Sequence, residues 1–182
     1  GKCLRVLMVD ALTGNDYSCI LCNHLSRIGA DVTLVTTEDR SIEFPISFRL
    51  RRWAPSKRPG SNRAVKSFKY IRYLGRLAIY ATSKQNDVVH FQFFRMERPE
   101  AILFGILRLL RVSLVYTAHN ILPHERRWGD PPFRALIYRS ANRIIVHSAT
   151  VKKRLLQAFE VPEHKVAIIP HGNFDNYRPQ NT

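Results

Sequence analysis

The sequence predicts a doubly wound α/β domain whose mostly parallel sheet has about seven strands flanked by helices. Two observations support this fold class. Short runs rich in Val, Ile, Leu and Thr alternate along the whole chain with segments of helical periodicity. The 182 residues, 45% of them hydrophobic, suffice to bury one core. Because consecutive parallel strands need a long crossover between them, usually a helix, the alternation predicts a series of βαβ units.

The first βαβ unit follows this pattern in order. Residues 4–9 form a short apolar run of the kind that is buried on both faces of a parallel sheet. Helical spacing follows over residues 17–28 and stops at Gly29, and glycine is common just beyond the end of a helix. Residues 31–36 are again β-branched. A right-handed crossover therefore joins two parallel strands.

The same alternation continues to the end of the chain. Each remaining apolar run is four to five residues long, and each is preceded by a polar connection or by a segment of helical spacing. We expect helices over residues 63–83, 97–110, 133–140 and 151–159, and strands over residues 46–50, 88–92, 114–118, 144–147 and 166–169.

The chain is strongly basic, with 29 Lys and Arg against 14 Asp and Glu and a formal net charge of +15. Such a surface favours anionic partners, namely nucleic acid, acidic lipid or phosphorylated substrates. The longest apolar run, residues 102–118, is interrupted by Arg108 and Arg111, so it does not predict a membrane span. No charged leader with a cleavage site precedes the first strand. We expect a cytoplasmic protein.

The three cysteines do not predict a disulfide framework. Cys19 and Cys22 form a CxxC motif, but they lie well inside the first expected helix, where small apolar residues pack against a sheet. We expect buried packing residues. The alternative, a redox or small-ligand module, would require both thiols to be accessible and to have a low pKa.

Polar residues collect where the expected strands end. In a parallel sheet the carboxyl ends of the strands share one edge, where helix N-termini and loop amides meet a ligand. His90, inside an apolar run, is expected to be a core histidine, and Ser148 is expected to cap the next helix. The candidate binding residues at this edge are Gly14 and Asn15, Arg95, His119 and Asn120, His124 and Glu125, His147, and His171, Gly172 and Asn173.

These residues do not predict a metal site. The spacing HExxH is absent, and Pro123 prevents His119, His124 and Glu125 from sharing one face of a helix. No glycine-rich phosphate loop of the dinucleotide or nucleotide type is present either. We therefore expect no bound metal or cofactor.

Several segments, in order, resemble the N-terminal, acceptor-side domain of a GT-B glycosyltransferase of the retaining group called family 4. They read GADVTLVTT, DVVHFQ, VYTAHN, ANRIIVHSATVKKRLL and VPEHKVAIIPHGNFDNYRP. The resemblance covers nearly the whole chain. It implies one half of a GT-B fold, which pairs two Rossmann-like domains around a cleft.

The resemblance also implies an activity. The N-terminal domain of such an enzyme holds a saccharide or lipid-linked acceptor, and the C-terminal domain holds a nucleotide-sugar donor, whose hexose is transferred with retention and usually without a metal. His119 then lies near the transferring sugar, in a catalytic or positioning role. Gly14 and Asn15 approach the donor phosphates or the acceptor, and the turn at residues 171–173 faces the cleft.

The expected domain boundary follows from the same resemblance. Residues 1–173 form the N-terminal domain, and residues 174–182 begin the linker to a donor-binding domain that the chain lacks. The nucleotide sugar would be held mainly by that missing domain. We therefore expect this chain alone to be inactive as a transferase.

The helix expected over residues 63–83 is both basic and amphipathic. Its apolar stripe comprises Val65, Phe68, Ile71, Leu74 and Ala78, and Lys66, Lys69, Arg72 and Arg76 surround it. Such a helix either packs on the sheet with a solvated basic face or lies on an anionic membrane surface as a peripheral contact, and the two are compatible. Its charge also fits a basic nucleic-acid-binding module. No exposed stacking platform or nucleic-acid motif accompanies the charge, so no specific nucleic acid is expected.

Overall fold

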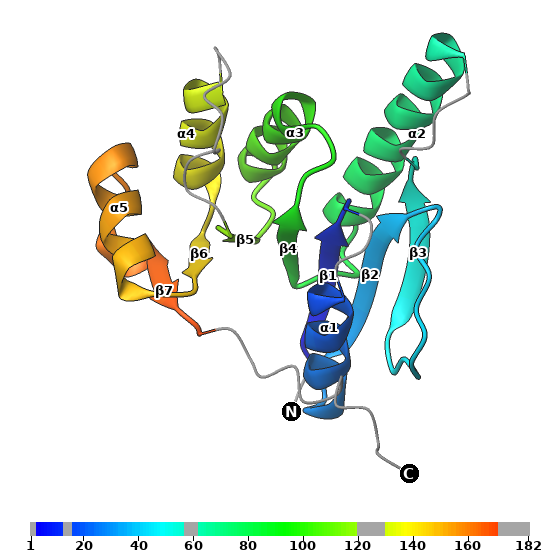
Figure 1. Cartoon of the computed structure of the whole chain (residues 1–182), viewed down its shortest axis with the longest axis horizontal. Coiled ribbons are helices and arrows are strands. Elements are labelled where there is room, and N and C mark those ends of the chain that lie inside the picture. The colour runs from blue at the N-terminus through cyan, green and yellow to red at the C-terminus, as the bar shows by residue number, and fades with distance from the viewer. Residues whose placement is uncertain (1–2, 13–15, 57–61, 120–129, 171–182) are drawn as a thin grey trace.

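The computed structural model describes residues 3–12, 16–56, 62–119 and 130–170, which form a single seven-stranded sheet with helices packed against it (Figure 1). Every strand pair is parallel. The strands, in the order in which they neighbour one another, are β3 (Arg49–Ala54), β2 (Asp31–Thr37), β1 (Arg5–Asp10), β4 (Val88–Phe93), β5 (Leu114–Thr117), β6 (Arg143–Val146) and β7 (Val166–Ile168). The predicted fold class is confirmed.

The strand order reverses direction between β1 and β4. The chain first builds outward from β1 through β2 to β3, then returns to the other side of β1 and builds outward from β4 to β7. The loops after β1 and β4 therefore leave the sheet toward opposite sides. A doubly wound sheet opens a crevice at such a point, which is where its ligands bind.

The helices cover two faces of the sheet. A larger core contains buried side chains of α2, α3, α4 and α5, with Tyr73, Phe104 and Tyr138 among the largest. A smaller core lies on the side of α1 and contains Cys19 and Cys22, both fully buried. These helices are α1 (Tyr17–Arg27), α2 (Arg63–Thr82), α3 (Glu97–Leu109), α4 (Asp130–Ser140) and α5 (Ala149–Phe159). The packing role predicted for the two cysteines is confirmed.

Local sequence signals set several helix ends. Ser148 Oγ accepts a hydrogen bond from the backbone N–H of Val151 at 3.2 Å, so the predicted cap of α5 is confirmed. Gly29 has a φ of +97°, which glycine adopts without strain, and it follows α1 as expected. At the start of α3, the Glu100 carboxylate accepts from the Met96 N–H at 2.8 Å and so satisfies this backbone donor.

The third strand lies later in the chain than predicted. The sequence analysis placed it at residues 46–50, where an apolar run stands, but β3 spans Arg49–Ala54 and pairs with β2. β3 is one of the two edge strands, and an edge strand tolerates charged side chains because one side of it faces water. Phe48, from the apolar run, is buried in the smaller core instead. The apolar run therefore belongs to the buried connection between β2 and β3 and not to the strand itself.

Helix α2 is also arranged differently from the prediction. Its buried stripe is Tyr73, Leu77 and Ala81, all in its second half. The predicted stripe does not pack as a unit, because Phe68 and Ile71 are each 67% exposed. The first half of α2 extends beyond the sheet (Figure 1). Because this half does not pack against the sheet, its apolar and basic side chains remain on the surface.

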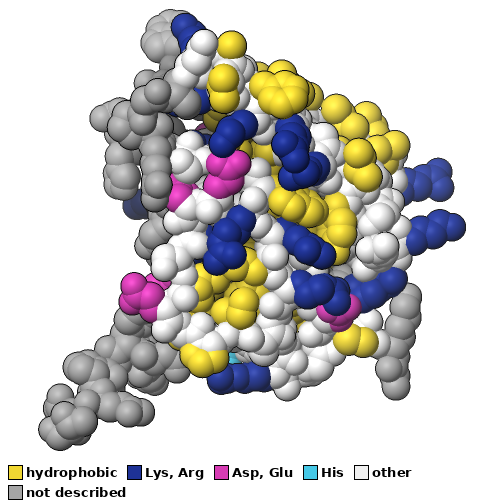
Figure 2. Space-filling view, turned by 90° about the vertical axis from the view of Figure 1, so that its right-hand side faces the viewer, with side chains coloured by type: hydrophobic (Ala, Val, Ile, Leu, Met, Phe, Trp, Pro, Cys, Tyr) yellow, Lys and Arg dark blue, Asp and Glu magenta, His cyan; other side chains and the backbone are white. Residues whose placement is uncertain are grey.

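The face that carries α2 and β3 shows hydrophobic and basic side chains next to one another (Figure 2). We call residues 63–72 of α2 the projecting half, and residues 73–82 the anchored half. All residues of the projecting half are exposed except Tyr70, which is half-buried. None of the helices in the described ranges combines the length and the apolar character that a membrane span requires.

Candidate functional site

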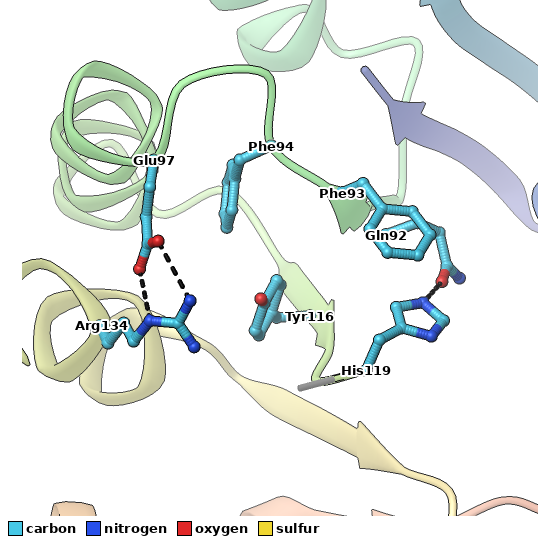
Figure 3. Close-up of a pocket in the computed structure, with 7 residues that line it drawn as sticks. All are labelled: Gln92, Phe93, Phe94, Glu97, Tyr116, His119 and Arg134. Atoms are coloured by element: carbon cyan, nitrogen blue, oxygen red, sulfur yellow. Dashed lines mark hydrogen bonds and ion pairs between the residues drawn. The ribbon is translucent and has the colours of Figure 1, made fainter. Parts of the chain in front are cut away.

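His119 lies directly beyond the carboxyl end of β5, and neighbouring side chains fix its ring. Its Nε2 is 2.9 Å from Gln92 Oε1. The ring stacks on Phe93 with a centroid distance of 4.2 Å and an interplanar angle of 11°. Figure 3 shows both contacts, which come from the end of β4. The strands place these groups together because β4 and β5 are parallel neighbours in register.

His147, which follows β6, joins His119 in the same cluster. Its Nε2 is 3.3 Å from His119 Nδ1, and its Nδ1 is 2.9 Å from the carbonyl oxygen of Ile169. Tyr17, the first residue of α1, meets both rings edge-on, with centroid distances of 5.6 Å to His119 and 5.9 Å to His147. Two of the predicted site residues are thus brought into direct contact.

His90 is the core histidine that the sequence predicted. It is buried, and its Nε2 lies 2.8 Å from Thr117 Oγ1 and 3.2 Å from Gln92 Nε2. Burial lowers the pKa of His90 to about 4, so the ring is neutral near pH 7. Gln92 is the link that the sequence analysis missed. Its position two residues after His90 in β4, on the same face of the sheet, is the signal that could have found it.

A cavity of about 160 Å³ opens beside His119. Its walls are largely aromatic, and an ion pair closes one side, with Arg134 Nε 2.8 Å from Glu97 Oε1. Apolar walls with a few charged groups suit a sugar ring, whose C–H faces pack on aromatic rings while its hydroxyls take hydrogen bonds. The lining residues, shown in Figure 3, are Gln92, Phe93, Phe94, Glu97, Tyr116, His119 and Arg134.

Arg95, one of the candidate binding residues, lies near the buried carboxylate of Glu100. Glu100 is fully buried, and its Oε1 accepts from the Tyr73 hydroxyl at 2.8 Å. Burial raises the pKa of Glu100 to about 7, although hydrogen bonds from the Met96 N–H and Tyr73 and the charge of Arg95 oppose that rise. The positive charge of Arg95 therefore stabilises the ionised form of Glu100. This buried carboxyl was not identified from the sequence.

Arg40 braces the connection between β1 and α1. It is 4% exposed, and it donates to the Leu12 carbonyl at 3.2 Å and to Asp16 Oδ1 at 3.3 Å. Leu12 and Asp16 stand on either side of the loop that contains Gly14 and Asn15. A buried arginine with these partners holds the two ends of that loop at a fixed separation. The sequence analysis did not identify Arg40 as a structural residue of this loop.

The remaining predicted site residues lie outside the described residues, so their roles stay predictions. Within the part of the chain that the structure describes, no group of three His, Cys, Asp or Glu side chains could hold a metal ion. The predictions that stay open concern Gly14, Asn15, Asn120, His124, Glu125, His171, Gly172 and Asn173.

Comparison with models of known protein families identifies the family of this chain. The model of glycosyltransferase family 4 matches residues 17–173, which is most of the sequence. The chain belongs to this family. The predicted resemblance to the N-terminal domain of a GT-B glycosyltransferase is thereby confirmed. No curated protein sequence matches the chain.

Solved structures share the fold of this family 4 domain. Sucrose-phosphate synthase from Thermosynechococcus elongatus aligns with a TM-score of 0.65 and 15% identity over 93% of this chain and 48% of that one. A glycosyltransferase from Rickettsia africae ESF-5 aligns with a TM-score of 0.60 and 11% identity, over 94% and 44%. UDP-N-acetylglucosamine 2-epimerase from Rickettsia bellii aligns with a TM-score of 0.57 and 13% identity, over 91% and 44%.

The chain spans about half the length of these proteins. Because one of them is named an epimerase, the fold alone does not distinguish glycosyl transfer from other chemistry on nucleotide sugars. The family that matches this chain is one of glycosyltransferases. The redox alternative requires accessible thiols with a low pKa. Cys19 and Cys22 are instead both buried, and burial raises the pKa of each thiol.

Proposed function

We propose that this domain holds the acceptor in a retaining glycosyltransferase that moves a hexose from a nucleotide sugar to a saccharide or lipid-linked acceptor. The observation that carries the proposal is the fixed ring of His119 beside the aromatic cavity, at the carboxyl edge of a family 4 domain. In such an enzyme a second domain would hold the donor. The products belong to polysaccharide or glycoconjugate synthesis.

The proposed chemistry needs no metal. In a retaining transfer the bond between the anomeric carbon and the phosphate oxygen breaks, and the bond to the acceptor oxygen forms on the same face. The departing phosphate can take the acceptor's proton, so His119 need not be the base. Because Gln92 and His147 already occupy its two ring nitrogens, His119 instead acts as a polar group that polarises the reacting centre. The acceptor ring occupies the cavity beside it, against Phe93 and Phe94.

Turnover of the full-length enzyme tests this role. His119→Ala should lower turnover by about 10²–10⁴-fold, the range typical of a lost catalytic side chain, while far-UV circular dichroism stays unchanged. His24→Ala is the matched control, because His24 is exposed at the other end of α1. Near-normal turnover of His119→Ala would remove the proposed role. NMR of the product's anomeric proton distinguishes retention from inversion, and an assay of this chain alone tests its expected inactivity.

We further propose that the enzyme is cytoplasmic and binds anionic lipid through the projecting half of α2. Val65, Phe68 and Ile71 are exposed there, with Lys66 and Lys69 among them. Exposed apolar side chains can enter the headgroup region while basic side chains meet anionic lipids. A lipid-linked acceptor would be reached from such a surface. The net charge of +15 supports this partner.

Vesicle co-sedimentation tests the lipid proposal with this chain. Replacing Lys66, Lys69 and Arg72 of the projecting half, together with Arg76 one turn further on, by Gln should weaken binding to vesicles containing phosphatidylserine by about 10²–10³-fold, since each basic residue near the surface contributes about 1 kcal/mol. The control removes the same charge from other exposed positions, with Arg139, Arg143, Lys153 and Arg154 replaced by Gln. Equal losses in both variants would show a nonspecific charge effect. Tighter binding to random oligonucleotides than to vesicles would assign the charge to nucleic acid instead.

A further inference from the structure

A continuous chain of hydrogen bonds connects two histidines at the edge of the sheet to a third in the core. It runs from the Ile169 carbonyl through His147 and His119 to Gln92, and from Gln92 to His90. The contacts along it measure 2.9, 3.3, 2.9 and 3.2 Å. Its members lie in β4 and directly after β5, β6 and β7, so this series of contacts forms only in the folded domain.

The outer partners decide which imidazole nitrogens carry hydrogen. A backbone carbonyl oxygen only accepts, so His147 Nδ1 donates to Ile169. The amide oxygen of Gln92 also only accepts, so His119 Nε2 donates to it. A neutral imidazole has one N–H and one lone pair. In two neutral rings, His119 Nδ1 and His147 Nε2 would therefore face each other with lone pairs across 3.3 Å.

We propose that His119 and His147 share one proton between these two nitrogens, and that Gln92 is the positioning residue that keeps it there. The shared proton turns a repulsive contact into a charge-assisted hydrogen bond. Each ring keeps its outer N–H for its own acceptor. The pair then carries one positive charge in total, and the two rings titrate as one coupled unit rather than as two independent histidines.

His90 fixes the orientation of Gln92. With its hydrogen on Nδ1, a neutral His90 ring accepts at Nε2 from the Gln92 amide nitrogen, 3.2 Å away, and this turns the amide oxygen toward His119. A half-turn of the amide would present its N–H to His119 instead. His119 would then carry hydrogen at Nδ1 and donate to His147, with both rings neutral. The two amide orientations therefore correspond to two protonation states of the pair.

The neighbouring groups suit a positive charge at this position. The face of Phe93, which is the electron-rich side of an aromatic ring, lies against His119. Tyr17, on α1, is a neutral neighbour, since burial raises its pKa. Across the cavity, Glu97 on α3 and Arg134 on α4 offset each other's charge.

One more titratable group lies on the adjacent strand. Asp10, at the end of β1, pairs in register with Phe93. Burial raises the pKa of Asp10. The hydrogen bonds from Ser18 and the Leu12 N–H and the positive charge of Arg40 oppose that rise.

One consequence rests on the proposed function. A single positive charge at the carboxyl edge attracts a phosphate group of the nucleotide sugar or of the nucleoside diphosphate product. The charged unit would then be the histidine pair, rather than His119 alone. Weaker donor binding above the pH at which the pair loses its proton would be its sign in the full-length enzyme.

The test itself needs no transferase activity. Histidine-selective ¹⁵N labelling of this chain and multiple-bond ¹H–¹⁵N correlation spectra report which nitrogen of each ring carries hydrogen. We expect His119 and His147 to take up one proton together, with hydrogen on His119 Nε2 and His147 Nδ1 and intermediate shifts at the facing nitrogens. The second proton should bind only at a pH lower by at least about one unit. Two independent titrations would overturn the proposal. A pair that stays neutral, with hydrogen on His119 Nδ1, throughout the titrated pH range would overturn it as well.

Two substitutions of Gln92 separate positioning from a merely structural role. Gln92→Glu places an anionic acceptor at His119 and should raise the proton affinity of the pair by about tenfold, whereas Gln92→Met removes the acceptor and should lower it by about tenfold. A structural role would disturb both variants in the same direction. Same-direction changes, or none, would contradict the proposal. If either variant fails to fold, the wild-type spectra decide the question by themselves.

Discussion

The edge of the sheet around His119 and the projecting half of α2 hold their side chains in opposite ways. At the edge, His119 has fixed partners on two sides, namely the amide of Gln92 and the ring of His147. On the projecting half, Phe68 and Ile71 are exposed to solvent. One region is defined by distances between individual atoms, and the other by the amount of apolar surface and charge that it presents.

This difference predicts how each region should respond to amino-acid substitutions. A hydrogen-bonded group acts through geometry, so a single substitution removes most of its effect. An exposed basic and apolar surface acts through many small contributions, so single substitutions there change little and only combined ones matter. Glu100 lies between the two regions, because it bonds to Tyr73 in the anchored half of α2 and lies in the first turn of α3, just beyond Phe93 and Phe94.

The largest expected effect compares the two halves of α2. Leu77→Ala should lower the free energy of unfolding by about 2–5 kcal/mol, because it leaves a cavity in the larger core. Phe68→Ala should change it by less than about 0.5 kcal/mol, because that side chain is already exposed. Urea unfolding followed by circular dichroism measures both. A large loss for Phe68→Ala would show that the projecting half packs against something.

The second prediction concerns the pH dependence that Glu100 confers. Burial raises its folded-state pKa from the ordinary value of 4.5 to about 7, so between these pH values the folded protein holds a proton that the unfolded chain has released. The stability that this group contributes is fully present below pH 4.5 and is lost as the pH rises through 7. The total is about 3 kcal/mol.

Glu100→Gln isolates that contribution. Between pH 4.5 and 8 the free energy of unfolding of the wild type should fall relative to this variant by about 3 kcal/mol. Glu43→Gln, at an exposed position, is the control and should track the wild type. A pH-independent difference between wild type and Glu100→Gln would mean that Glu100 does not change its protonation state in this range.

The third prediction tests the helix that follows His147. Ser148→Ala removes the cap of α5 and should cost about 1 kcal/mol of stability. Ser67→Ala, in the projecting half of α2, should be neutral or stabilising by a few tenths of a kcal/mol, because alanine is the better helix former. Thermal unfolding of the two variants measures the contrast. Equal losses would indicate that both serines bond to the backbone.

The smallest expected effect concerns the ring under His119. Phe93→Leu keeps an apolar side chain but removes the aromatic stack, which is worth about 0.5–1.5 kcal/mol, so turnover of the full-length enzyme should fall by about two- to tenfold. Phe44→Leu, which lies at the smaller core, is the control and should keep its turnover. An unchanged rate for Phe93→Leu would show that Gln92 alone positions the ring.

Most of the fold could be predicted from the sequence. The apolar periods placed six of the seven strands and all five helices near their observed positions, because a strand buried on both faces and an amphipathic helix carry distinct patterns. The exception, β3, carries Arg49, Arg51 and Arg52. Charge is permitted on an edge strand, and which strand forms the edge depends on the order of the whole sheet.

The candidate site could be predicted only in part. The sequence placed His119 and His147 at the carboxyl edge, since each directly follows an apolar strand. It did not identify Gln92, Glu100 or Arg40, whose partners lie 27, 27 and 28 residues away along the chain. Contacts over such separations depend on strand register and helix placement, which no local pattern encodes.

The sequence by itself therefore determined the class of the fold, the family and the edge of the sheet where polar residues gather, because these follow from periodicity and from residues close together in the chain. Only the tertiary structure decided that His119 meets His147, that Gln92 joins them to the core, and that half of α2 remains exposed. Each of these depends on how neighbouring strands and helices are aligned. That alignment is set by the packing of the entire sheet.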